Sequence, residues 1–580
     1  MDSIPDDILI YILEQHENID FLDILNLSLV SKRFKTIVKL IKPEKIYKIY
    51  RKEHLFISER FPNIKFSYTE SINDNLSEND LKNIKKLKTN NTNTISNKLN
   101  VSILDVSNTI EEVNMTNIYN NFKNLKSLNL SFCHINTYPE TTINLKTLKM
   151  ENFRCDLNEF ITFINSKTLI DIDLSFTDIK DVSIINNIKK VNLSNCRNIA
   201  NLESLNNVYE LILSNTNVSD MSFFTGTNIL VLDFCRIKLK SVDYLPNLKY
   251  LSLTRCDSIK DYSQLKNVKT LESLNLYKNN SFENILDIPE NIKYLNISKC
   301  YEIKNIQELS KFKNLKDLNC SGCLGIHEIP FIENLRKLDI SYCYDIKKLN
   351  IPSSTYYVNA DFCHNLCLEC DYKNLSTLSF FNNEILKDVS ILRNIKDINL
   401  TNCRNIIDVT PLRNCKKIDL SFCDNIIDFD SLLDVYDLNI SYCKGLKEFG
   451  RFSNNHILNI SNCKNISDIS KLENVYDLNI SGTNINDISR LNKVTKLNIS
   501  RCFNIKDISM LGNVYNIDLS FCNQITDVSS LENTVILTIR NHNSHIKGMD
   551  NLKKLYYLDV SYSHNIINLD KLKHVFRIIL

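Results

Sequence analysis

The chain has 580 residues, with only 8 Gly, 9 Pro and no Trp, but 19 Cys and 81 Asn. So little Gly disfavours a nucleotide-binding enzyme, and it also disfavours four ordinary domains of roughly 150 residues each. A net charge of +2, from 70 basic and 68 acidic residues, argues against a nucleic-acid binder, which usually carries a strong basic excess. Asn replaces Gly where the backbone needs a positive φ, so this composition predicts many similar small turns.

The first residues do not read as a targeting segment. Asp2, Asp6 and Asp7 precede any basic residue, unlike a secretory signal peptide. We find no apolar run long enough to span a bilayer, and we therefore expect no membrane contact. We expect a cytoplasmic protein in a reducing compartment, in the host cell if the chain is viral, with its thiols free.

Residues 3–40 do not repeat, and they predict three short helices. Ser3 caps the first helix, with Pro5 in its first turn. Asp20 caps the second helix and Ser31 the third, and each helix carries apolar residues at helical spacing. A core this small is marginal alone and needs a partner or a neighbour.

This stretch resembles the F-box. It carries Ile4-Pro5-Asp6-Asp7-Ile8-Leu9 and, further on, Val30-Ser31-Lys32-Arg33-Phe34, in the order that the family shows. The resemblance implies binding to the Skp-type adaptor of a cullin–RING ubiquitin ligase. The residues expected to form or support the adaptor-binding face are Ile4, Pro5, Ile8, Leu9, Val30 and Phe34. The alternative is an amphipathic helical cap on the open end of the repeats that follow.

Residues 42–100 connect this module to the repeats. Mixed charges and aromatics in 42–70 suggest a helix and a strand. Residues 71–100 are rich in Asn and Ser and contain a faint repeat at Ile84 and Leu87. This part is either a linker or a decayed first repeat.

From residue 101 to 580 the chain repeats about 23 times, with a period of 20 residues and spacings from 19 to 24. The last full consensus unit is VTKLNISRCFNIKDISMLGN, residues 494–513. The alternation at Leu497-Asn498-Ile499 predicts a short strand, and Cys502 turns the corner. The length left over predicts a return path of 3₁₀ turns and extended loop. One unit cannot close its own core, so the units should stack with parallel strands.

The pattern resembles the leucine-rich repeat. Its motif appears, for example, as Leu125–Cys133, Leu248–Cys256 and Val435–Cys443. The Asp-Ile-Ser segments look like internalin-type repeats, and the cysteine looks like the repeats of F-box proteins. The expected fold is therefore α+β. It comprises a small three-helix F-box at 1–41 and a curved solenoid at 101–580, with a concave parallel sheet and a convex side of loop and 3₁₀ turns.

Thirteen of the 19 cysteines occupy the ninth position of a repeat, where a small side chain packs inward. They are Cys133, Cys196, Cys256, Cys300, Cys323, Cys343, Cys363, Cys403, Cys423, Cys443, Cys463, Cys502 and Cys522. Two pairs resemble metal ligands, namely Cys320 with Cys323, and Cys367 with Cys370 near His364. No second pair follows at zinc-finger spacing, so we favour repeat packing and expect no metal and no cofactor.

Between the inward residues of each strand, three stripes should face the concave side. One is Asn or Asp, the next is Ser or Thr, and the third varies. Exposed aromatics and Arg are enriched in interaction hot spots, so the third stripe supplies the candidates for binding a protein target. They are Phe132, Phe176, Arg236, Arg255, Lys278, Lys299, Tyr342, Phe362, Phe422, Tyr442, Arg501, Phe521 and Tyr562. The alternative is that the aromatics stack on each other and the charges only solvate the face.

Catalytic chemistry is not expected. The ten His are scattered, no nucleophile motif pairs one with Ser and Asp, and no Gly-rich phosphate loop occurs. The sequence therefore predicts a non-enzymatic substrate-recognition subunit of an SCF-type (cullin–RING) ubiquitin ligase. The alternative is a repeat-only interaction scaffold, or an internalin-like adhesion protein, with no role in ubiquitin transfer.

Overall fold

The structure is a computed structural model. It describes residues 46–49, 65–68, 84–88, 101–109, 112–138, 142–153, 157–165, 167–205, 207–220, 222–224, 229–242, 245–368, 372–451, 453–563, 572, 575 and 577–579. The chain divides into two compact units, unit 1 up to Leu271 and unit 2 from Glu272 to Leu580. The helices expected in residues 3–40 lie outside the described residues.

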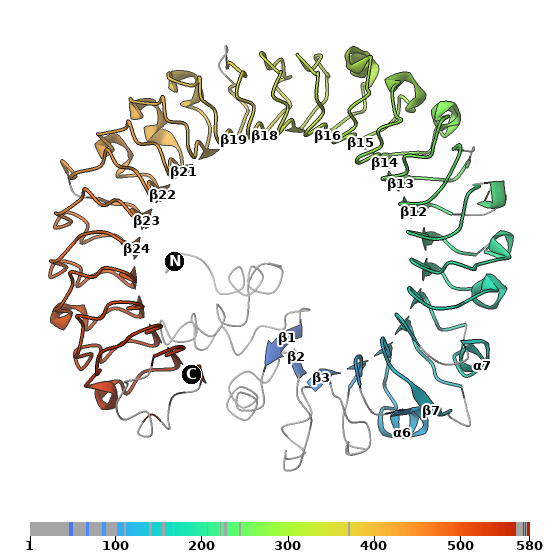
Figure 1. Ribbon diagram of the computed structural model, residues 1–580, viewed down its shortest axis with the longest axis horizontal. Helices are drawn as coiled ribbons and strands as arrows, with labels where there is room; N and C mark the ends of the chain where they lie inside the picture. The colour runs from blue at the N-terminus through green and yellow to red at the C-terminus, as the bar shows by residue number, and fades with distance from the viewer. Residues whose placement is uncertain are drawn as a thin grey trace, which may run out of the picture. The chain divides into compact units, whose positions relative to one another are not determined.

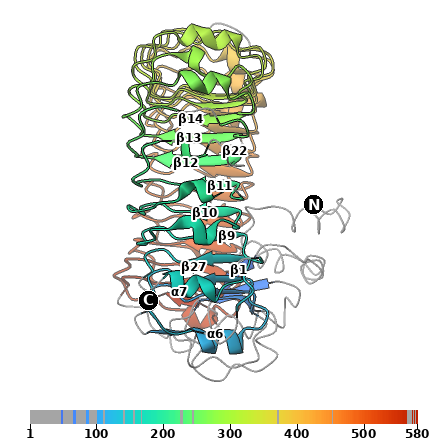
Figure 2. The same cartoon turned by 90° about the vertical axis from the view of Figure 1, so that its right-hand side faces the viewer.

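Unit 1 is built on a ladder of short parallel strands. The strands are β1 (Ile46–Ile49), β2 (Lys65–Tyr68), β3 (Ile84–Lys88), β4 (Ile103–Asp105), β6 (Ser127–Asn129), β8 (Thr147–Lys149), β9 (Asp171–Asp173), β10 (Lys190–Asn192), β11 (Glu210–Ile212), β12 (Val231–Cys235) and β13 (Tyr250–Thr254). A small second sheet pairs β5 (Val113–Asn114) with β7 (Ile135–Thr137). Figure 2 shows β9 to β12 stacked as rungs.

Unit 2 continues the same architecture with greater regularity. Its strands are β14 (Ser273–Asn275), β15 (Tyr294–Asn296), β16 (Asp317–Asn319), β17 (Lys337–Asp339), β18 (Tyr357–Asn359), β19 (Thr377–Ser379), β20 (Asp397–Asn399), β21 (Lys417–Asp419), β22 (Asp437–Asn439), β23 (Ile457–Asn459), β24 (Asp477–Asn479), β25 (Lys496–Asn498), β26 (Asn516–Asp518), β27 (Ile536–Thr538), β28 (Tyr557–Asp559) and β29 (Arg577–Ile579). Within this unit the strands lie on the inner side of the bend and the return segments on the outer side (Figure 1).

From β14 to β28, each strand pairs with the next in the same register. Ile418 of β21, for example, is the partner of Leu438 of β22, which in turn pairs with Leu458 of β23. The middle residue of each of these strands is buried and points inward, because side chains alternate across a strand. In the consensus unit, Leu497, Ile499 and Ile505 are at most 3% exposed. The inward pattern predicted from the sequence is therefore confirmed, and the core is one continuous column within each unit.

The described return path combines extended loop with eleven short 3₁₀ turns, as predicted. They are η1 (Val182–Ile185), η2 (Leu202–Ser204), η3 (Ser222–Phe224), η4 (Ser263–Asn267), η5 (Ile285–Asp287), η6 (Ile306–Lys311), η7 (Ser390–Leu392), η8 (Thr410–Asn414), η9 (Asp430–Leu432), η10 (Ser509–Leu511) and η11 (Met549–Asn551). Two long repeats of unit 1 have room for a short α-helix instead, α6 (Met115–Asn121) and α7 (Leu157–Thr162). In the described residues, no helix is both long and apolar enough to cross a membrane.

Strand pairing begins before residue 101. In the part of 42–100 that the structure describes, β1, β2 and β3 pair successively in parallel, and β3 pairs with β4. The faint repeat at Ile84 and Leu87 is β3, and Leu87 is fully buried. The sheet therefore extends into the segment that the sequence left open between a linker and a decayed repeat.

The corner cysteines form a ladder of hydrogen bonds. Each of the thirteen is at most 1% exposed. Each donates its S–H to a backbone carbonyl of the preceding repeat, as Cys423 does to Leu400 O at 3.3 Å and Cys463 to Ile440 O at 3.1 Å. Burial raises the pKa of Cys403 to about 12, so that thiol stays protonated and remains a donor.

Other residues at the corner also donate, which the sequence analysis did not anticipate. Asn383 donates to Cys363 O and Ser563 to Ile539 O, both in the preceding repeat. Thr177 and Thr483 donate instead to carbonyls of their own repeats, Leu174 O and Ile480 O. Small size, which the sequence analysis emphasised, is therefore only part of what the corner requires. A buried carbonyl there needs a donor.

Replacement of one corner cysteine separates these two requirements. Cys423→Ser keeps the size and a donor toward Leu400 O, whereas Cys423→Ala leaves that carbonyl with the Cys403 N–H at 3.1 Å as its remaining donor. Because a buried hydrogen bond contributes about 1 kcal/mol, we expect the Ala variant to be less stable than the Ser variant by about that amount. Urea unfolding followed by circular dichroism measures this difference. Equal stability of the two variants would show that the corner selects size alone.

Asp residues that cap the return turns give the fold a dependence on acid pH. The Ser470 N–H donates to Asp468 Oδ1 at 2.8 Å, and this hydrogen bond lowers the pKa of Asp468. A carboxyl with a lowered folded-state pKa stabilises the fold fully above its unfolded pKa of about 3.9. That contribution disappears as the pH falls through the folded-state pKa. We therefore expect the melting temperature to fall below about pH 4.

Two variants of Asp468 test the cap. Asp468→Asn keeps the acceptor oxygen but cannot titrate, so its melting temperature should rise relative to wild type as the pH is lowered. Asp468→Ala removes the acceptor and should cost about 1 kcal/mol at neutral pH. Thermal unfolding of both variants from pH 7 to pH 3 measures this. A difference between the Asn variant and wild type that stays constant over this range contradicts the expectation.

Candidate interaction face of the repeats

The candidate surface is the side of the strand layer that faces solvent rather than the core. We call it the strand face. In the consensus unit it carries Lys496 and Asn498, on either side of the buried Leu497, and the corner residue Arg501. The same positions recur in each repeat, so side chains form rows that run from strand to strand.

The side chains of the Asn/Asp row accept hydrogen bonds from the backbone. Asn498 Oδ1 accepts the N–H of Ser500 at 2.9 Å, which closes a side-chain turn at the end of β25. The Ser/Thr row often binds the same carboxylate, as Ser421 Oγ does to Asp419 at 2.6 Å. These two stripes, which the sequence analysis placed on the concave side, therefore hold the strand ends in shape and are not free for a ligand.

The residues of the variable third stripe also lie at the corner, one position before that of the cysteines. All thirteen candidate residues have a positive φ, between 55° at Arg236 and 63° at Phe521. Their N–H groups continue the ladder, as Tyr442 N–H does to Ser461 O at 2.8 Å. Asn takes the same conformation at eight equivalent corners, namely 108, 152, 195, 215, 382, 402, 462 and 541. The predicted use of Asn for such turns is confirmed.

Aromatic and basic residues at this corner work against local preference. A left-handed backbone costs a non-Gly residue about 1 kcal/mol, and Asn tolerates it better than Phe or Tyr does. Gly322 and Gly482, which adopt it freely, occupy only two corners. The aromatic and basic side chains at the other corners must therefore be selected by their contacts rather than by the turn.

Several of these contacts lie within the face itself. The rings of Tyr342 and Phe362 stack at 4.6 Å, and those of Phe422 and Tyr442 at 4.4 Å. The Arg501 guanidinium lies 5.0 Å from the centre of the Phe521 ring. These pairs support the stacking alternative. Yet Tyr342, Phe422 and Tyr442 remain more than 40% exposed, so one side of each pair still faces solvent.

Three candidates carry exposed rings without such a pair. Phe132 is 43% exposed, Phe176 is 53% exposed and Tyr562 is 74% exposed. No ring contact joins them to another residue of the described ranges. They are the corner residues with the most apolar surface to offer a partner.

The basic corner residues divide between the two units. Arg236 and Arg255 belong to unit 1, and Lys278 and Lys299 belong to unit 2. In unit 1, burial raises the pKa of Asp233, which lies two residues before Cys235 on β12. In unit 2, the Lys299 ammonium lies 5.7 Å from the centre of the Tyr277 ring. Each unit thus carries one pair of these basic residues.

The sequence analysis missed the row just before each strand. In unit 2 this row stacks Tyr436, His456 and Tyr476, with ring centres 4.7 and 4.5 Å apart. Basic residues take the same position in earlier repeats, including Lys396 and Lys416. The sequence contains a signal for this row, because aromatic and basic residues recur there at the repeat spacing. The sequence analysis considered only the residues from the strand to the corner.

The cysteine pairs considered as metal ligands belong to the packing. Cys323 donates to Ile297 O at 3.0 Å as a member of the ladder, and Cys320 is an inward strand residue beside it. Cys367 is exposed, and Cys370 lies outside the described residues. Over the part of the chain that the structure describes, no three His, Cys, Asp or Glu residues are grouped to hold a metal ion.

The candidate adaptor-binding residues Ile4, Pro5, Ile8, Leu9, Val30 and Phe34 all lie outside the described residues. The motifs that contain these residues can instead be compared with models of known protein families. Residues 1–45 match the family model of the F-box domain.

Comparison with curated proteins gave no match. Among solved structures, the chain is similar to the functional domain of InlJ from Listeria monocytogenes, which includes a cysteine ladder. That match has 15% sequence identity and a TM-score of 0.29, and covers 65% of this chain and 76% of the other. At this TM-score the likeness carries no argument, and the repeat assignment depends on the spacing and strand register above. Residues 1–45 of this chain therefore match the F-box domain, and its described strands form a parallel ladder with the spacing of leucine-rich repeats.

Proposed function

We propose that this protein is the substrate-recognition subunit of an SCF-type ubiquitin ligase. The observation that carries the proposal is the F-box match at residues 1–45, which contains both motif segments. F-box domains generally bind Skp-type adaptors. In this proposal, Ile4, Pro5, Ile8, Leu9, Val30 and Phe34 form or support the adaptor-binding face. The subunit then acts in the cytoplasm.

The repeats hold the protein target. We propose three parts, an F-box at 1–41, a connecting part at 42–100 and about 23 repeats at 101–580. The strand face offers rows of side chains on many parallel strands, and the exposed corner aromatics supply contacts of the kind enriched in interaction hot spots. The protein is not itself catalytic in this proposal. Its contribution is to hold the target near a separate transferring enzyme, which raises the rate by proximity.

Binding of the full-length chain to a purified Skp-type adaptor tests the proposal. We expect capture of the adaptor, and we expect Leu9→Ala or Pro5→Ala to weaken it by roughly tenfold or more, because truncated anchors commonly cost over about 1.4 kcal/mol. Leu324→Ala is the matched control, because Leu324 is a 50% exposed leucine of the repeats. Surface plasmon resonance measures the three affinities.

Two results would count against the ligase role. One is that the wild-type chain fails to capture the adaptor. The other is that the Leu9 and Pro5 variants capture it as well as the Leu324 variant does. Either result would leave a repeat protein that binds partners without ubiquitin transfer.

A further inference from the structure

One edge of the strand face in unit 2 is strongly basic. Arg393, Lys396, Arg413, Lys416 and Lys417 come from two consecutive repeats, and all five are exposed. The three lysines lie at the start of β20 and β21, whereas Arg393 follows the return turn η7 and Arg413 is part of the return turn η8. We call this set the basic edge. The N–H groups of Lys416 and Lys417 both donate to Lys396 O, at 2.8 and 3.0 Å. The ladder therefore fixes these residues as neighbours in adjacent repeats.

Elsewhere, neighbouring repeats place opposite charges side by side. Lys190 pairs with Glu210 of the next repeat at 2.7 Å. In unit 2, Lys293 pairs with Glu272 at 3.0 Å, and Lys304 pairs with Glu283. On the basic edge the neighbours carry the same sign instead. Like charges on adjacent strands destabilise a sheet, so this arrangement is unfavourable for the isolated fold.

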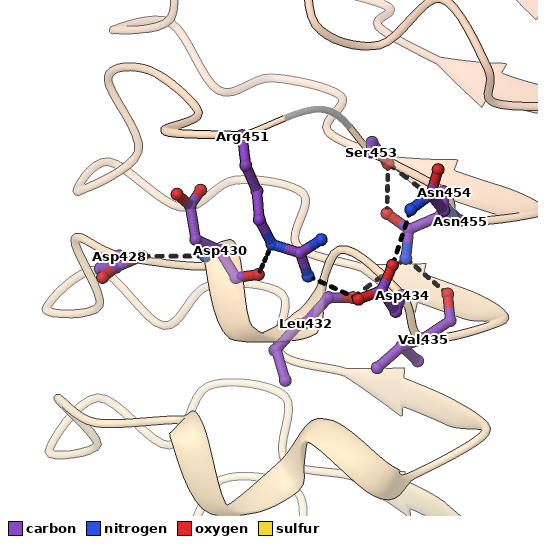
Figure 3. A network of polar contacts seen from close by, with 9 residues as sticks. All are labelled: Asp428, Asp430, Leu432, Asp434, Val435, Arg451, Ser453, Asn454 and Asn455. Atoms are coloured by element: carbon purple, nitrogen blue, oxygen red, sulfur yellow. Dashed lines mark hydrogen bonds and ion pairs between the residues drawn. The ribbon is translucent and has the colours of Figure 1, made fainter.

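Two nearby carboxylates are already paired, one of them with a member of the basic edge. Asp437 pairs with Lys417 at 3.5 Å. Asp434 accepts hydrogen bonds from Arg451 Nη2 and Asn454 Nδ2, both at 2.8 Å (Figure 3). Arg451 also donates to Asp430 O at 2.7 Å, which anchors the guanidinium on the return side. Asp434 is therefore already engaged by the following repeat.

Three of the five cations of the basic edge are thus poorly neutralised. Asp397, an exposed carboxylate at the start of β20, is the acidic residue of that strand. In the described ranges, no ion pair within 4.0 Å joins Lys396, Arg413 or Lys416 to any carboxylate. Three cations in two neighbouring repeats therefore still lack an anionic partner.

The row that starts at this edge changes from basic to aromatic. Lys396 and Lys416 are followed at the same position by Tyr436, which is 57% exposed and stacks on His456 at 4.7 Å. Successive positions are about 4.8 Å apart, the spacing of paired strands. A ligand lying along this row would therefore meet positive charge first and then exposed ring surface.

We propose that the basic edge docks a short acidic segment of a partner protein, with carboxylates on the lysines and an apolar or aromatic residue on Tyr436. Charge complementarity selects the acidic part, and the exposed ring selects the residue that follows. Nucleic acid fits less well, because the whole chain carries a net charge of only +2. This deepens the proposed function, since the acidic segment would belong to the captured protein, and to that extent it depends on that function.

Binding of a labelled peptide to the full-length chain tests this site. The probe is a fluorescein-labelled run of glutamates ending in Phe-Tyr. Comparison probes are the same peptide with lysines and a single-stranded oligo-dT of equal length. We expect the glutamate probe to bind by fluorescence anisotropy and to weaken as salt is raised, because screening acts on exposed charges. The lysine probe should not bind, and the oligo-dT should bind more weakly than the glutamate probe.

A double charge reversal locates the site. Lys396→Glu with Lys416→Glu should weaken glutamate-probe binding by roughly tenfold or more, since four units of charge change at the contact. Lys387→Glu with Lys447→Glu makes the same change at exposed lysines on the return side, and should alter binding by less than about twofold. Lys396→Gln with Lys416→Gln removes the charges without adding acids, and serves if the Glu variant does not fold.

Three results would overturn the proposal: unchanged binding in a folded basic-edge variant, equal loss in the return-side control, and tighter binding of the oligo-dT than of the glutamate probe. The adaptor assay separates this from failure of the ligase role. The basic-edge variant should still capture the adaptor. Loss of adaptor capture by the wild-type chain would overturn the ligase role without altering the peptide result.

Discussion

The hydrogen bond from each of the thirteen corner cysteines back to the preceding repeat is the interaction on which the fold depends. One repeat has an open apolar edge and cannot be stable alone. At the corner the chain leaves the strand, and the thiol gives a buried carbonyl of the preceding repeat a donor from the next repeat, as Cys423 does to Leu400 O. The thiol does this at a size that the column can accommodate. Because the bond joins neighbours, it also fixes the register that sets every row of the strand face.

That register decides which side chains remain available to a partner. The Asn and Asp of the strands bind the backbone two residues on, as Asn498 does with Ser500, so a conspicuous polar row is structural. The side chains that remain available to a partner are those of the variable third stripe and those of the row just before each strand. Both are ordered by the backbone ladder, yet their side chains extend into solvent. A solenoid of this kind therefore varies its recognition surface without disturbing its core.

The two parts of the chain would bind their partners through different interactions. In the proposed ligase role, the F-box is a small apolar module completed by an adaptor, and its motif residues supply the anchors. The repeats offer a broad face on which charge and aromatic surface change from one repeat to the next. The basic edge and the adjoining Tyr436, His456 and Tyr476 stack are one such change, within five successive repeats. Discrimination between targets would then depend on the order of these rows.

The amino-acid sequence by itself determined the repeat, its inward residues and its 3₁₀ return path, because a 20-residue period with this alternation permits one kind of stacking. It also identified the F-box through the order of Ile4-Pro5 and Val30 to Phe34. Only the tertiary structure decided that the corner requires a donor, that Phe422 and Tyr442 stack with a positive φ, and that Asp434 is held by Arg451. These facts depend on contacts between residues about 20 positions apart, and periodicity fixes that such residues are neighbours without fixing which atoms meet.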